Sequence, residues 1–100
     1  MAITVDSFRE FFNLYQTDIT QSEFDRSLEI AKERFLKLLG LSTFPSVLTA
    51  IQEELIFHLI LLEHLKKVNF LISPETQRFS INKVAEHIER LVWIIKAQMN

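Results

Sequence analysis

Apolar residues recur every three or four positions along much of the chain, and short polar connections separate these stretches. In residues 5–15 they form one helical stripe, made of Val5, Phe8, Phe11, Phe12 and Tyr15. A second stripe runs through residues 21–39 and consists of Phe24, Leu28, Ala31, Phe35, Leu38 and Leu39. This spacing is typical of an amphipathic helix with one buried face. The pattern therefore predicts helices over 5–15 and 21–39.

The second half of the chain predicts two more helices. One extends from about Pro45 to Lys67 and is apolar nearly all round between Leu55 and Leu62. The other covers residues 81–98, and its predicted inward face consists of Ile81, Val84, Ala85, Ile88, Leu91, Val92 and Ile95. Between them, Ser73-Pro74-Glu75 predicts a turn or a short helix. We therefore expect an all-α fold: a single four-helix domain over residues 1–100, with a long apolar central helix at about 45–67.

Three of these helices share one start signal. Thr4, Thr20 and Ser80 each follow an apolar residue, and another apolar residue stands four positions later. The hydroxyl oxygen of such a cap accepts a hydrogen bond from an otherwise unpaired backbone N–H. Glu23 completes a capping box with Thr20. Gly40, the single glycine of the chain, stands where a left-handed residue ends a helix.

Composition and charge narrow the function classes. One Gly and two Pro in 100 residues are too few for the turns of an all-β fold. The absence of cysteine excludes disulfides, thiolate metal ligands and a cysteine nucleophile. The 11 basic and 13 acidic residues are spread evenly, so we expect no specific nucleic-acid readout. No signal peptide and no apolar stretch of about 20 residues is present, so we expect a cytoplasmic protein without a membrane span.

Residues able to do chemistry are few. Glu54 and His58 share a helix face, but the Glu-x-x-His spacing of di-metal helical bundles is absent. We expect these two side chains to form a hydrogen-bonded polar pair. The serines and threonines near helix starts and turns are explained by capping, and one glycine cannot build a phosphate-binding loop. The sequence therefore predicts no enzyme, no metal site and no cofactor.

The helix at 45–67 is more apolar than one buried face requires. One interpretation is that the other three helices surround it; the other is that another subunit covers an exposed apolar face of this helix or of the last one, and both can hold in part. For the second case, the candidate interface residues are Phe57 and Ile60 on this helix, together with Trp93 and Ile94, which lie off the inward stripe of the last helix.

The order of these elements is informative as a whole. After a short first helix, the capped second helix ends in the run Leu28 to Gly40, in which small and apolar residues precede the glycine. A loop with Pro45 follows, and the next helix opens with Val47, Ala50 and Ile51. Over residues 4–66 this order resembles the head–tail connector (adaptor) proteins of tailed bacteriophages. The resemblance implies a non-enzymatic viral protein that forms a homo-oligomeric ring, contacts portal and tail proteins, and passes from host cytoplasm into the virion.

Two other functions stay open. The chain could be a small helical protein-binding module or inhibitor, located in the cytoplasm, that occludes a protein partner. It could also be a helix-turn-helix DNA binder, which needs a basic recognition helix. The last helix carries Lys83, Arg90 and Lys96 against Glu86 and Glu89. That balance makes DNA binding the third choice.

Overall fold

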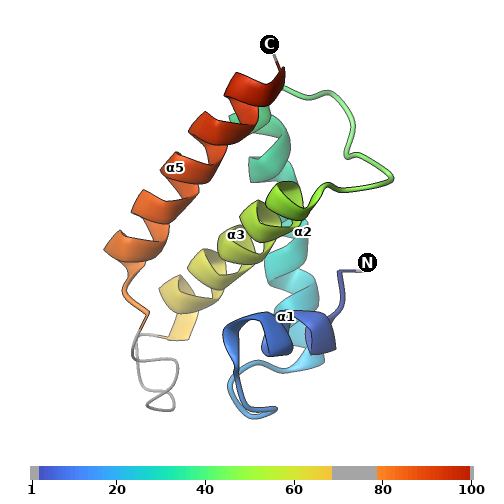
Figure 1. Ribbon diagram of the computed structural model, residues 1–100. Helices are drawn as coiled ribbons and strands as arrows, with labels where there is room; N and C mark the ends of the chain where they lie inside the picture. Colours follow the sequence, from blue (N-terminus) through green and yellow to red (C-terminus); the bar gives the residue numbers. More distant parts are fainter. Residues whose placement is uncertain (1–2, 69–78, 100) are drawn as a thin grey trace.

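The computed structural model describes residues 3–68 and 79–99, and this part of the chain contains four α-helices and no strand (Figure 1). The helices are α1 (Val5–Phe12), α2 (Gln21–Leu39), α3 (Ala50–Val68) and α5 (Ile81–Met99). The prediction of an all-α fold with four helices is therefore confirmed. The turn or short helix predicted at Ser73-Pro74-Glu75 lies outside the described residues.

Helix α3 is the centre of the packing. Both α2 and α5 pack along it, and α1 lies across its side (Figure 1). Every α3 residue from Leu55 to Leu65 is buried except His58, which is partly buried. Of the two alternatives for this helix, the structure therefore supports the first, in which the other helices surround it.

The predicted cap residues act as expected in α2 and α5. Thr20 Oγ1 accepts from the Glu23 backbone N–H at 3.2 Å, and Glu23 Oε1 accepts from the Thr20 N–H at 2.8 Å. Ser80 Oγ accepts from the Lys83 N–H at 3.1 Å. Gly40 ends α2 with φ 68°, a left-handed conformation that L side chains rarely adopt. The predicted range of α2 is therefore correct at both ends.

Helix α1 also begins at its predicted cap but ends earlier than expected. Thr4 and Ser7 exchange side-chain-to-backbone hydrogen bonds of 2.9 and 3.0 Å. Asn13 then adopts φ 55°, and its N–H bonds back to Glu10 O at 3.2 Å. Asparagine tolerates the left-handed region better than most residues, so it ends the helix here. Tyr15 consequently lies beyond the helix and is exposed instead of continuing the buried stripe.

Helix α3 begins at Ala50, not at Pro45 as predicted. Thr49 forms the cap: its Oγ1 accepts from the Gln52 N–H at 3.3 Å, and Gln52 Oε1 accepts from the Thr49 N–H at 2.9 Å. This reciprocal pair is a capping box, a stronger start signal than a proline alone. The residues before it form an irregular connection, in which Phe44 packs its ring 5.0 Å from that of Phe35.

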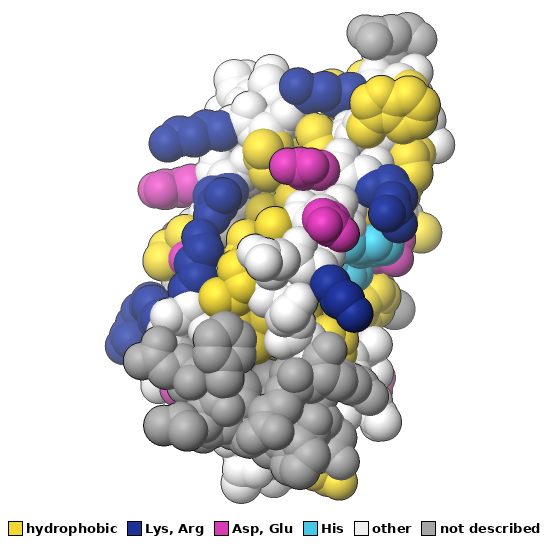
Figure 2. Space-filling model, turned by 90° about the vertical axis from the view of Figure 1, so that its left-hand side faces the viewer, with side chains coloured by type: hydrophobic (Ala, Val, Ile, Leu, Met, Phe, Trp, Pro, Cys, Tyr) yellow, Lys and Arg dark blue, Asp and Glu magenta, His cyan; other side chains and the backbone are white. Residues whose placement is uncertain are grey.

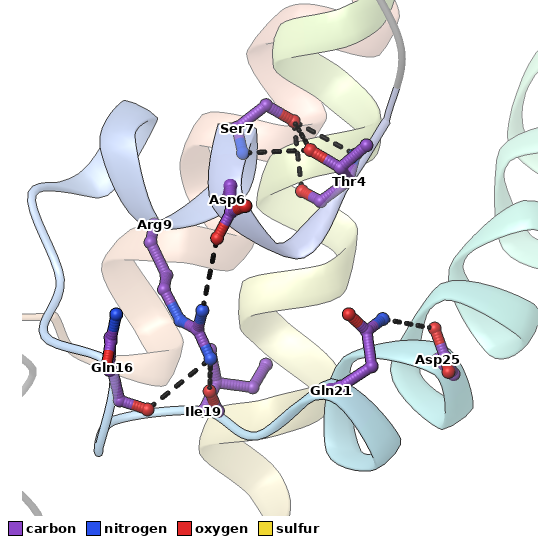
Figure 3. A network of polar contacts seen from close by, with 8 residues as sticks. All are labelled: Thr4, Asp6, Ser7, Arg9, Gln16, Ile19, Gln21 and Asp25. Carbon is purple, nitrogen blue, oxygen red and sulfur yellow. Dashed lines mark hydrogen bonds and ion pairs between the residues drawn. The ribbon is translucent and has the colours of Figure 1, made fainter.

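Arg9 fastens α1 to the connection that leads into α2 (Figure 3). Its guanidinium donates to the backbone carbonyls of Gln16 and Ile19 and pairs with Asp6 at 3.3 Å. Figure 3 shows the Arg9 side chain extending from α1 toward this connection. The contacts hold α1 in place, so that Phe8 reaches the core with no exposed surface.

Two polar side chains of α3 that lie in the interior, Glu63 and His64, have polar partners. Arg34 Nη1 of α2 lies 2.9 Å from the nearly buried Glu63 Oε1 of α3, and Lys66 Nζ lies 3.5 Å from the same oxygen. His64 Nε2 lies 2.7 Å from the backbone oxygen of Asp18. Since a carbonyl oxygen only accepts, His64 donates this bond through Nε2. These contacts join α3 to α2 and to the connection that precedes α2.

Candidate functional site

The outward face of α5 carries the largest exposed aromatic side chain of the described residues. Val84, Ile88, Leu91 and Ile95 point into the core, and Trp93 lies opposite them with 73% of its surface exposed. Apart from Met99 at the end of the helix, which is 50% exposed, the other exposed residues of α5 are polar, charged or small, namely Asn82, Lys83, Glu86, Glu89, Arg90, Lys96, Ala97 and Gln98. Figure 2 shows apolar atoms between interspersed basic and acidic side chains on one face of the molecule. A tryptophan in such a place is typical of a protein contact surface.

The four predicted interface residues do not share one surface. Phe57 and Ile60 are buried in the core. The ring of Phe57 packs against α1, 6.1 Å from Phe8 and 5.0 Å from Phe11 between centroids. Ile94 is partly buried, which leaves Trp93 as the exposed member of the set.

The 40–49 connection exposes an apolar side chain that the sequence did not single out as a contact. Val47 is 82% exposed, because α3 begins only after it. Figure 1 shows the tip of this connection on the opposite side of the molecule from α5. The capping box of Thr49 and Gln52 was the sequence signal that places Val47 outside the helix.

A second feature joins α3 to α5 through polar side chains. The rings of His58 and His87 lie 4.3 Å apart between centroids, at an interplanar angle of 45°. Glu54 Oε1 lies 3.6 Å from His87 Nε2. His58 Nδ1 lies 2.7 Å from the backbone oxygen of Glu54 and therefore carries a proton. The predicted hydrogen bond between Glu54 and His58 is present, but the Glu54 backbone carbonyl accepts it, and the Glu54 carboxylate faces His87 instead.

The surroundings of His58 favour its neutral form. Burial lowers the pKa of His58, and the charge of His87 lowers it further, whereas the hydrogen bond to the Glu54 carbonyl and the Glu54 charge oppose this shift. On the α1 side the ring meets Phe11 and Phe12 edge-on, at 5.9 and 5.1 Å between centroids. Figure 2 shows histidine atoms reaching the surface beside charged side chains.

Two hollows flank this part of α3. One, of about 170 Å³, is lined by His58, Phe79, Ser80, Lys83, Val84 and His87. The other, of about 200 Å³, is lined by Phe11, Ala50, Glu53, Glu54 and Phe57. Within residues 3–68 and 79–99, no three His, Asp or Glu side chains converge as a metal-binding group. The histidine pair therefore stands as an interhelical contact with an open hollow beside it.

The fold and these features define an all-α protein with an exposed tryptophan and an interhelical histidine pair. No protein-family model matches the chain, and no curated protein or solved structure shows a significant similarity to it. Among the described helices, none combines the length and hydropathy needed to cross a membrane.

Proposed function

We propose that the protein is a structural interaction protein, a subunit of a homo-oligomeric ring of the kind that phage head–tail connectors form between portal and tail. The observation that carries the proposal is Trp93, which is 73% exposed on the outward face of α5. Exposure of so large an apolar ring is unfavourable in water, and tryptophan is enriched among the residues that dominate interface energies. The order of helices over residues 4–66 supports the same proposal through its resemblance to the connector family.

A ring needs two different surfaces on each subunit, because its contacts are head-to-tail. The outward face of α5 supplies the first. The 40–49 connection, with exposed Val47, supplies the second on the opposite side of the molecule (Figure 1). In this proposal Trp93 of one subunit packs near Val47 of the next, and the charged neighbours of Trp93 form the rim of the contact.

Light scattering over a concentration series tests the proposal. We expect the unaltered chain to form a closed oligomer and Trp93→Ala to be smaller at equal concentration, with unchanged helical content by circular dichroism. Glu29→Ala is the control, since it truncates an exposed charged side chain on α2, outside both proposed surfaces, and should leave the mass unchanged. A chain that stays monomeric throughout, alone and mixed with a portal protein, would rule out the connector role.

A binding module or inhibitor is the second candidate, because the same exposed Trp93 could contact an unrelated protein. It predicts a monomer whose binding to that protein is weakened by Trp93→Ala. DNA binding has less support. The described connections 13–20 and 40–49 are longer than the three or four residues of a helix-turn-helix.

A further inference from the structure

The packing of α5 on α3 combines apolar side chains with one pair of titratable rings. The inward residues of α5 on either side of the pair, Val84, Ile88 and Leu91, are buried. His87 instead meets His58 at 4.3 Å between ring centroids. Imidazole changes its charge between pH 5 and 8. The contact between the two histidines therefore depends on pH in this range, whereas the contacts between apolar side chains do not.

The neutral state of His58 suits the geometry. Its Nδ1–H donates to the Glu54 carbonyl at 2.7 Å, so the hydrogen bond is made without any charge. Phe11 and Phe12 of α1 pack against the ring and shield one side of it from water. A charged ring in this place would lose hydration that the two phenyl rings do not replace.

The charged groups around the pair stabilise a proton on His87 more than a proton on His58. On α3, the Glu54 carboxylate lies 3.6 Å from His87 Nε2 and can pair with a proton there. On α5, Lys83 lines the same hollow as both histidines and adds a positive charge. From α1 come only the uncharged rings of Phe11 and Phe12. One proton on His87 is therefore compensated, whereas a second proton on His58 places two cations in ring contact.

We propose that His58 and His87 form a proton-sensitive latch between α3 and α5, closed while His58 is neutral and opened more often when both rings are protonated. The lowered pKa of His58 agrees with this arrangement. Opening would expose the inward face of α5 and the side of α3 beneath it. The latch is independent of whether the chain forms a ring, since it lies between helices of one subunit.

Amide hydrogen exchange followed by NMR tests the latch between pH 7.5 and 5.5, after correction for the intrinsic exchange rate. We expect the opening of α5, measured at Ile88 and Leu91, to increase as the pH falls, and the opening of α2, measured at Ala31, to change less. His58→Phe and His87→Phe should each abolish this extra increase. His64→Gln is the matched control, because it replaces another α3 histidine, keeps a donor toward Asp18 and should retain the increase.

A second readout does not depend on the folding of the His58 variant. In the unaltered chain, the His58 ring signal should titrate below the ordinary histidine value of 6.5, and in His87→Phe its midpoint should move upward. The latch is refuted if α5 and α2 open with the same pH dependence, or if the extra opening of α5 survives in His58→Phe. A His58 midpoint at or above 6.5 in the unaltered chain would refute it as well.

Discussion

Arg34 of α2 and Glu63 of α3 form an ion pair with an Nη1–Oε1 distance of 2.9 Å, and the Glu63 carboxylate is nearly buried. Lys66 reaches the same oxygen at 3.5 Å. If Arg34 is removed, the Glu63 carboxylate keeps the cost of dehydration and retains only the longer contact with Lys66 to offset it. The packing of α2 on α3 therefore depends on Arg34.

We expect Arg34→Met to lower the free energy of unfolding by about 1–2 kcal/mol, as measured by urea denaturation at pH 7. Lys66→Met is the matched control. It removes the longer contact to the same carboxylate and should cost less than about 1 kcal/mol. Equal losses in the two variants would show that the 2.9 Å contact of Arg34 contributes no more to stability than the 3.5 Å contact of Lys66.

Phe8 connects α1 to both α2 and α3. Its ring lies 5.2 Å from Phe12, 5.7 Å from Phe24 and 6.1 Å from Phe57, and it has no exposed surface. Phe8→Ala should therefore cost about 3–5 kcal/mol in thermal or chemical unfolding. Phe11→Ala, from the same helix but nearly half exposed, should cost clearly less. The prediction fails if the two losses are equal.

Gly40 ends α2 in a left-handed conformation with φ 68°, and beyond its chain neighbours an added Cβ would meet no atom within 4 Å. The cost of Gly40→Ala is therefore conformational, without a clash, and should be about 1 kcal/mol in the free energy of unfolding. Gly40→Asn should cost less, because asparagine tolerates this region, as Asn13 does at the end of α1. A neutral effect of alanine would contradict this account of the helix end.

His58 and Glu23 should each make the free energy of unfolding depend on pH, in two separate pH ranges. Burial lowers the pKa of His58 below 6.5 in the folded state, so the unfolded chain takes up a proton more readily. The free energy of unfolding should fall as the pH decreases from 6.5 toward the lowered value. The backbone N–H of Thr20 lowers the pKa of Glu23 below 4.5, so its contribution is present above pH 4.5 and is lost as the pH falls through the lowered value.

Urea denaturation between pH 3 and 7.5 checks both windows. His58→Phe should remove the loss that begins near pH 6.5 and leave the acid one in place. Glu23→Gln should do the reverse, because its amide oxygen still accepts from Thr20 but carries no charge. If neither variant changes the pH profile, other titrating groups control the stability.

Local signals in the sequence were enough to predict the helices. The apolar stripe, the Thr20 cap with Glu23, and Gly40 agree on the bounds of α2, and the structure reproduces them at both ends. A cap or a helix-ending glycine acts within a few residues of the helix end, so its effect does not depend on which distant parts of the chain pack against the helix. The predicted end of α1 and start of α3 were wrong although local signals for both were present. Asn13 marks the end of α1, and Thr49 with Gln52 marks the start of α3.

Which side chains meet was decided by the tertiary structure. Helix α3 is apolar nearly all round and has no stripe to orient it, so the sequence could not say that Phe57 and Ile60 would be buried. The stripe of α5, by contrast, already placed Trp93 on the outward side of that helix. The contact of His58 with His87 likewise joins two helices whose relative rotation and height are set by packing. Periodicity along one chain determines the faces of single helices, and only the assembled core determines which faces come together.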